Sequence, residues 1–420
     1  MTSEKRGPVW YWAFYDWANS AFATTVIAGF FPIFFKQYWS EGVPATQSTL
    51  HLGLGSALAS AVVLVLAPIM GAMADRGGRK KRYLLLFTLL GVLCTAGFFW
   101  TGQGEWPLAI GLFVLASIGF FGGLTFYDSL ITNVSRPHDY DRVSALGYGL
   151  GYLGGGVLLA VNVAMTLKPE WFGLAGKAEA IRWSFLCVAL WWLLFSLPLF
   201  LGVREPRQPD APGWRKAAGG AVRELGRTFA DIRARRAVFV FLLAYWLYID
   251  GVHTIIRMAV DFGLSLGFAD TSLITALLLV QFIGFPAAVA FGYLGAWWGT
   301  KRAIYLGLMV YAGVTAWGYF LQHEWQFYCM AAVIGLVQGG VQSLSRSYFA
   351  RLIPEGKSGE FFGFYNMMGK FAAIIGPLLV GWTAALTGDA RLSILSVLVL
   401  FLAGGLLLTR VQPSADPANG

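Results

Sequence analysis

The sequence predicts an all-α integral membrane protein, and three observations lead to this fold class. Of the 420 residues, 57% are hydrophobic and only 13% are charged, whereas soluble globular chains have about 25% charged residues. The apolar residues form long runs, each close to the ~20 residues that a helix needs to cross a bilayer. In lipid, only helices or closed barrels satisfy the hydrogen bonds of the backbone. Barrel strands alternate apolar and polar residues, and these runs do not, so they predict helices.

Short polar segments separate the apolar runs. The first run is not a cleaved signal peptide, because it is too long, carries Asp16 and Asn19 near its start and lacks a small-residue cleavage site. We therefore expect twelve transmembrane helices. They centre near Val26, Ala61, Leu90, Ala116, Leu153, Trp191, Leu247, Leu278, Leu308, Ile334, Ile374 and Val399.

The basic residues predict the orientation of the chain. With a cytoplasmic N-terminus, 23 of the 31 Lys and Arg residues fall in cytoplasmic segments and 5 in segments on the other side. This asymmetry places both termini in the cytoplasm, as an even number of spans requires. The net charge of +9 is therefore explained by basic residues on the cytoplasmic side of a lipid bilayer, and we expect no nucleic-acid partner. We expect a multi-pass protein of the cell inner (cytoplasmic) membrane.

The longest polar stretch, residues 204–236, carries three prolines and nine basic residues. It predicts a cytoplasmic basic linker between two six-helix bundles, residues 1–203 and residues 237–420. The segments at 71–81 and 292–302 support a duplication, because both keep two glycines seven residues apart and end in basic residues. Carriers built from parallel six-span repeats bind their substrate near the midplane, between the repeats.

The segment after the second span resembles the signature loop of the major facilitator superfamily, Gly-x-x-x-Asp-Arg-x-Gly-Arg-Arg. The matching residues are Gly71, Asp75, Arg76, Gly78, Arg79 and Lys80. These residue types suit a gate, since Gly71 lets two helices approach closely and Asp75 can pair with a cation or cap a helix N-terminus. The second copy has Ala296 at the place of the acid, so we expect no such ion pair there.

Longer strings carry a closer resemblance. They run over residues 15–25, 344–354, 360–366, 369–371 and 376–379. These strings resemble the unknown major facilitator branch, which is similar to the fungal vacuolar effluxers that release amino acids after autophagy. The resemblance implies a 12-helix major facilitator fold for most of the chain, and export of a small molecule such as an amino acid. The short linker favours a bacterial type of member.

Ionisable residues inside spans cost at least ~2.5 kcal/mol at the helix centre and therefore mark candidate functional positions. In the seventh span, Asp250, His253, Arg257 and Asp261 share one helical face. An Asp beside a His can take up and release protons. The alternative is a structural ion pair, in which Arg257 holds one of the two acids.

The first, tenth and eleventh spans add polar residues at helical spacing. Arg346 and Lys370 can hold a substrate carboxylate, or they can neutralise Asp16 or Asp128 across a gate. The predicted substrate- or proton-coupling residues are Asp16, Asn19, Asp250, His253, Arg257, Gln338, Gln342, Arg346, Asn366 and Lys370. The predicted gating residues are Gly71, Asp75, Arg76, Arg79 and Asp128.

These observations favour a proton-coupled secondary active transporter that moves an amino acid or peptide-like solute by alternating access. We expect a monomer without cofactor or metal. A facilitative uniporter and a non-transporting receptor on the same scaffold remain alternatives. A membrane enzyme is disfavoured, because the four histidines lie on four separate segments and no nucleophile motif or metal-ligand spacing accompanies them.

Overall fold

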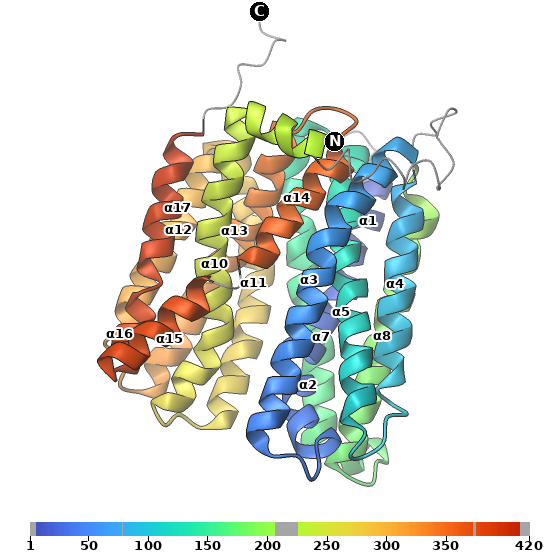
Figure 1. Cartoon of the computed structure of the whole chain (residues 1–420), viewed down its shortest axis with the longest axis vertical. Coiled ribbons are helices and arrows are strands. Elements are labelled where there is room, and N and C mark those ends of the chain that lie inside the picture. The colour runs from blue at the N-terminus through green and yellow to red at the C-terminus, as the bar shows by residue number, and fades with distance from the viewer. Residues whose placement is uncertain (1–5, 78, 206–225, 373–374, 412–420) are drawn as a thin grey trace, which may run out of the picture.

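The computed structural model describes residues 6–77, 79–205, 226–372 and 375–411. All regular structure in these residues is helical, and the long helices run side by side (Figure 1). The start of the first helix and the end of the last lie at the same end of the bundle (Figure 1). We call this end the terminal face and the other end the opposite face.

The N-half, which we define as residues 6–203, begins with a composite first span. It consists of α1 (Arg6–Ala21), a π-helical segment (Phe22–Phe30), α2 (Phe31–Phe34) and a second π-helical segment (Phe35–Trp39). The other helices are α3 (Ala45–Gly77), α4 (Lys80–Gly97), α5 (Trp106–Ser129), α6 (Ile131–Val134), α7 (Tyr140–Leu167) and α8 (Lys177–Gly202), with single turns at Pro137–Asp139 and Pro169–Phe172.

The C-half, residues 236–411, follows a short helix over residues 226–234. Its helices are α10 (Arg236–Ser265), α11 (Asp270–Trp298), α12 (Thr300–Gly318), α13 (Glu324–Leu352), α14 (Ser358–Phe371), α15 (Ile375–Thr387), α16 (Ala390–Leu395) and α17 (Leu398–Thr409). Residues 206–225 of the expected linker lie outside the described residues, as do residues 373–374 at the expected centre of the eleventh span.

In the described part of the chain, ten helices are long and apolar enough to cross a membrane, rather than the twelve expected. The expected spans near Leu90 and Leu308 correspond to α4 and α12, which run alongside the others in Figure 1 but are not among the ten. Both are short, with 18 and 19 residues, and both carry basic residues in the first turn. The apolar length that remains is below the ~20 residues of a standard span.

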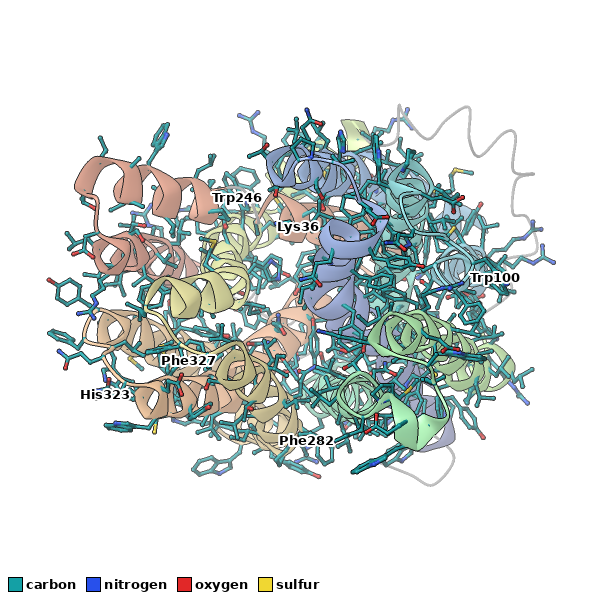
Figure 2. The ribbon with its side chains drawn as sticks, turned by 90° about the horizontal axis from the view of Figure 1, so that it is seen from below. Lys36, Trp100, Trp246, Phe282, His323 and Phe327 are labelled. Atoms are coloured by element: carbon teal, nitrogen blue, oxygen red, sulfur yellow. The ribbon has the colours of Figure 1, made fainter. Side chains whose placement is uncertain are left out.

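Apolar side chains cover much of the outer surface, as a bilayer requires. Leu201, Leu386 and Trp297 are more than four-fifths exposed. Tryptophans also lie exposed at helix ends, for example Trp100 and Trp171, where interfacial anchoring is typical. Figure 2, drawn from the opposite face, shows Trp100 on the N-half and Phe327 on the C-half.

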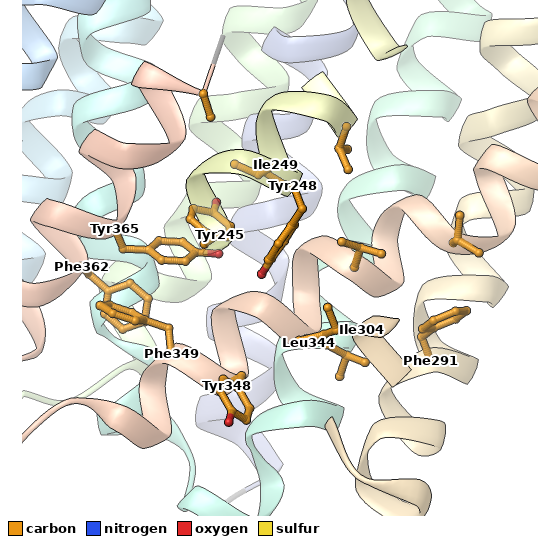
Figure 3. Close-up of a cluster of buried hydrophobic side chains, with 14 of the residues drawn as sticks. Tyr245, Tyr248, Ile249, Phe291, Ile304, Leu344, Tyr348, Phe349, Phe362 and Tyr365 are labelled. Atoms are coloured by element: carbon orange, nitrogen blue, oxygen red, sulfur yellow. The ribbon is translucent and has the colours of Figure 1, made fainter. Parts of the chain in front are cut away.

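Inside the C-half, stacked aromatic rings join α10, α13 and α14 (Figure 3). The ring centroids of Tyr245 and Tyr365 are 4.2 Å apart, and those of Phe349 and Tyr365 are 5.0 Å apart. Tyr248 shares a hydrogen bond of 2.7 Å with Ser345 on α13. These contacts fix the α13 and α14 faces that meet the N-half.

The two sequence echoes make corresponding contacts between the halves. Gly71 on α3 packs so closely on the start of α14 that a Cβ atom would collide with the Gly359 carbonyl. Gly292 on α11 packs on the start of α7, where a Cβ atom would collide with Ala145. Each echoed glycine thus lets its helix approach the beginning of a helix in the other half.

Candidate functional site

A cavity of about 400 Å³ lies between the two halves. Helices α1, α5 and α7 line it from the N-half, and α10, α11, α13 and α14 line it from the C-half. Eight of the ten predicted coupling residues are among its lining residues: Asp16, Asn19, His253, Gln338, Gln342, Arg346, Asn366 and Lys370. Its size and its mixture of aromatic and polar walls are typical of a small-molecule site.

Arg346 on α13 is the centre of the polar network and is only 2% exposed. Its Nη1 atom lies 2.9 Å from Asp128 Oδ1 and 3.4 Å from Asp16 Oδ2. Its Nε donates to Ser144 Oγ at 2.8 Å, and its Nη2 donates to the Ser144 carbonyl at 2.9 Å. All of these acceptors belong to the N-half, so one guanidinium ties the two halves together.

Aromatic rings surround the same guanidinium. Its Cζ atom lies 4.4 Å from the ring centroid of Tyr148, 4.8 Å from that of Trp12 and 5.4 Å from that of Tyr127. Cation–π contacts of this kind stabilise a desolvated cation by about 2 kcal/mol. They offset part of the cost of burying Arg346 away from water.

The two acids also have neutral partners. Tyr127 Oη donates to Asp16 Oδ2 at 2.7 Å, and Asn366 Nδ2 donates to Asp128 Oδ2 at 3.0 Å. Asn366 lies on α14, so the Asp128 carboxylate contacts two helices of the C-half. The cluster therefore sets two carboxylates against one guanidinium at the interface of the halves.

Two further donors line the cavity. Asn19 is 2% exposed, and its Nδ2 atom has no hydrogen-bond partner within the described residues. The Lys370 ammonium stands over the ring of Phe121, on the other half. A buried unpaired amide costs about 1–3 kcal/mol, so Asn19 is suited to donate to a bound solute.

The signature loop closes the terminal face. Asp75 accepts from the backbone N–H of Gly359 at 2.9 Å and from that of Glu360 at 2.8 Å. Lys80 Nζ lies 3.0 Å from Asp75 Oδ1. An acid of α3 thus caps the N-terminus of α14 in the other half, where a negative charge is favourable.

At the contact between α11, which carries the second echo, and α7, the acid belongs to α7. Ala296 supplies no carboxylate, as expected, but Asp141 on α7 does. Asp141 Oδ2 accepts from Thr300 Oγ1 at 2.8 Å and lies 2.9 Å from Arg351 Nη2. Ser347 also donates to Asp141. The second contact between the halves therefore has an ion pair after all, because α7 provides the acid that α11 lacks.

Asp250 does not line the cavity. It is fully buried, and its Oδ2 and Oδ1 atoms accept from the backbone N–H groups of Ile375 and Gly376, both at 3.1 Å. Thr254 Oγ1 donates to it at 3.3 Å. The carboxylate therefore caps the N-terminus of α15, which explains a charge in this span without a contact to solute.

The other predicted residues are less informative. Gly71 and Asp75 take part in the terminal-face contacts, and Arg79 is exposed between α3 and α4. The side chains of Arg76, Arg257 and Asp261 lie outside the described residues. The prediction that Arg257 pairs with an acid on its own helix therefore stays a prediction.

Comparison with known proteins identifies the family. The family described as "Vacuole effluxer Atg22 like" matches residues 46–415. The chain belongs to this Atg22-like family. An uncharacterized MFS-type transporter of Bacillus subtilis, YxiO, is 37% identical over 406 residues, which cover 95% of this chain and 94% of YxiO.

More distant proteins share the fold. Autophagy-related protein 22 of Coccidioides immitis is 24% identical over 429 residues, covering 83% of this chain and 70% of its own. The crystal structure of the human organic anion transporter MFSD10 superposes with a TM-score of 0.72 at 18% identity, over 97% of this chain and all of MFSD10. The Atg22-like protein is therefore a multi-pass membrane transporter of the major facilitator fold and not an enzyme, as the sequence predicted.

Several residues of the Atg22-like site escaped the sequence analysis. Asp141, Ser144 and Arg351 were not singled out, although they complete the contacts between the halves. A signal was present in another correspondence between the halves, in which Arg136-Pro137 follows the fourth span and Ile353-Pro354 follows the tenth. Asp141 lies at the start of α7, just after Pro137, and Arg351 lies at the end of α13, just before Ile353.

Proposed function

We propose that this chain is a proton-coupled secondary transporter that exports a small zwitterionic solute, such as an amino acid or a short peptide-like molecule. The observation that carries the proposal is Arg346, which is buried between Asp16 and Asp128 of the other half, beside a cavity of solute size. We further propose that it works as a monomer in the cell inner membrane, with the terminal face in the cytoplasm.

The proposed mechanism is alternating access between two bundles, residues 1–203 and 237–420, joined by the linker 204–236. The contacts of Asp75, Asp141 and Arg346 all join the halves toward the terminal face. In our mechanism, this arrangement is the outward-facing state. Breaking these three ties opens the cavity to the cytoplasm, where the solute enters before export.

A zwitterion fits the cavity because both signs of charge line it. Arg346 and Lys370 can hold a carboxylate, and Asp16 or Asp128 can hold an ammonium group. When the halves separate, the ion pairs of Arg346 with Asp16 and Asp128 break. The three side chains can then bind the charged groups of the solute instead. The word "effluxer" in the description of the matching family supports the export direction.

Protons can drive the same switch. A proton on Asp128 removes the charge that faces Arg346 at 2.9 Å, which weakens the tie between the halves. His253 lines the cavity and can relay that proton. Coupling follows if the proton and the solute compete for the same carboxylate.

A facilitative uniporter is the second candidate. It is favoured by the neutral partners Tyr127 and Asn366, which hold the two acids in place whether or not protons move. The two candidates differ in one property: only the coupled transporter accumulates solute against a gradient when a pH difference is imposed.

The experiment is transport by the purified chain in proteoliposomes, with a panel of radiolabelled amino acids and dipeptides. We expect counterflow of at least one solute, and accumulation when a pH gradient is imposed. Asp128→Asn should retain counterflow and lose the pH-driven accumulation, while Asp139→Asn, whose partner His138 lies in the same turn, should behave as wild type. Counterflow without any pH effect in the wild type would establish the uniporter, and movement of no solute would refute transport of this class.

A further inference from the structure

A second and larger cavity lies at the terminal face. It is a groove of about 1420 Å³, and residues of both halves line it. The N-half contributes the loops around Lys80 and Arg136, and the C-half contributes the start of α12 and the end of α13. The groove is separate from the transport cavity, since the two share no lining residue.

The groove has an excess of cations. Five Lys and Arg side chains line it, against three acidic side chains. Asp75 caps α14 and pairs with Lys80. Arg351 pairs with Asp141, and Lys301 donates to two backbone carbonyls. Within the described part of the chain, the exposed side chains of Arg136 and Arg302 form no hydrogen bond or ion pair. The two guanidinium groups belong to opposite halves.

The start of α12 adds backbone donors to the groove. The first N–H groups of a helix have no acceptor within the helix, and here Gly299 at the N-cap has no side chain to supply one. The first turn holds Lys301 and Arg302 and no acid, although a basic residue is unfavourable beside the positive end of a helix. This combination of backbone and side-chain donors is suited to an anion.

A buried hydroxyl points to the same ligand. Tyr348 lines the groove and is 7% exposed, and its Oη atom has no hydrogen-bond partner among the described residues. Figure 3 shows Tyr348 at the edge of the aromatic cluster, with its hydroxyl directed away from the labelled rings. A buried hydroxyl without a partner is unfavourable, and an anion in the groove would accept from it.

We propose that the terminal-face groove binds a phosphate-bearing anion between Arg136 and the Arg302–Tyr348 side, and that this anion holds the terminal face closed. Guanidinium groups bind phosphate oxygens with paired hydrogen bonds. The donors lie on both halves, so the complete site exists only while the halves meet. A ligand at 100 times its dissociation constant then favours the closed state about a hundredfold.

A lipid headgroup and a soluble phosphate compound share this chemistry, and nanodiscs separate them. The full chain is placed in neutral phosphatidylcholine nanodiscs and titrated with pyrophosphate by calorimetry. In a second arm, it is placed in nanodiscs containing phosphatidylglycerol without added phosphate, and its melting temperature is compared with that in phosphatidylcholine. Binding in the first arm identifies a soluble ligand, and stabilisation in the second identifies a lipid headgroup.

Three variants test the residues in whichever arm responds. Arg302→Gln should weaken binding at least tenfold, and Tyr348→Phe, which removes only the hydroxyl, should weaken it about threefold to tenfold. Arg410→Gln is the matched control, because Arg410 is exposed on the terminal face but does not line the groove. No response in either arm, an unchanged Tyr348→Phe variant, or equal losses in Arg302→Gln and Arg410→Gln would each overturn the proposal.

A distance measurement tests the link to closure. Spin labels are placed at positions 138 and 297, which are exposed residues of the N-half and the C-half at the terminal face, in a background without the three native cysteines. Pyrophosphate or phosphatidylglycerol should increase the population with the short distance. An unchanged distance distribution under conditions of saturated binding would refute the bridging role.

Discussion

Neutralising Asp128 should open the terminal face. Asp128→Asn keeps the size of the side chain but replaces the carboxylate that lies 2.9 Å from Arg346 Nη1. A hydrogen bond to a charged group contributes about 1.5–3 kcal/mol, and removing one partner of a buried pair costs about 3–5 kcal/mol when the other is left alone. Arg346 keeps Ser144 and Asp16 as partners, so the lower range applies.

This cost falls on the closed state, because the tie exists only when the halves meet. The ratio of terminal-open to terminal-closed molecules should therefore rise by about 10- to 150-fold. Spin labels at positions 138 and 297 measure this ratio directly. Asp16→Asn should have a smaller effect, since Asp16 lies 3.4 Å from the guanidinium, and Asp139→Asn should have none. An Asp128→Asn variant with an unchanged distribution would refute the assignment of Arg346 as a tie.

Three further predictions concern the terminal face and the seventh span. Gly71→Val should abolish counterflow while the chain still inserts, because its side chain would collide with the Gly359 carbonyl and prevent closure; transport with normal rates would contradict this. Asp250→Leu should lower the stability to unfolding by about 1–3 kcal/mol, because two N–H groups at the start of α15, one buried and one partly buried, lose their acceptor, and denaturation in detergent measures it. Lys357 donates to Asp231 at 2.6 Å and lowers the pKa of that carboxyl below its ordinary value of 3.8. A carboxyl with a lowered pKa stabilises the folded contact above the ordinary pKa, and this stabilisation is lost as the pH falls through the lowered pKa. The amide protection factors of residues 226–234, which correct for the pH dependence of intrinsic exchange, should therefore be constant from pH 8 to 5 and fall below about pH 4, but not in Lys357→Gln.

The sequence could predict the fold class because it depends on composition and length. Apolar runs of span length and an uneven distribution of basic residues are properties of one chain read from end to end. The count of twelve spans is not confirmed at α4 and α12, whose first turns hold Lys80 and Lys301. A basic residue in the first turn makes the apolar part of the helix shorter than the helix itself.

The sequence could predict which residues lie at the candidate site, but not which side chains contact one another there. Charges and amides inside spans indicated the predicted coupling residues, because burying such groups is costly, and eight of these ten line the cavity. Which of them meet depends on helix packing. Asp250 caps α15, about 125 residues further along the chain, and no periodicity in the seventh span could indicate that partner. Asp141 was missed because it looks like an ordinary acid at a helix start.

The contacts that Asp75 and Asp141 make between the halves differ in how easily a substitution can remove them. Asp75 is held by the backbone N–H groups of Gly359 and Glu360; the donor at 360 persists when its side chain changes, whereas a Cβ atom at 359 would collide with the Gly71 carbonyl and with Asp75. Asp141 is held by the side chains of Arg351, Thr300 and Ser347, and each of these can be lost in one substitution. A saturation scan should therefore find position 360 tolerant at the first contact, and positions 300, 347 and 351 sensitive at the second, so single substitutions can tune closure of this carrier more easily on the α7 side.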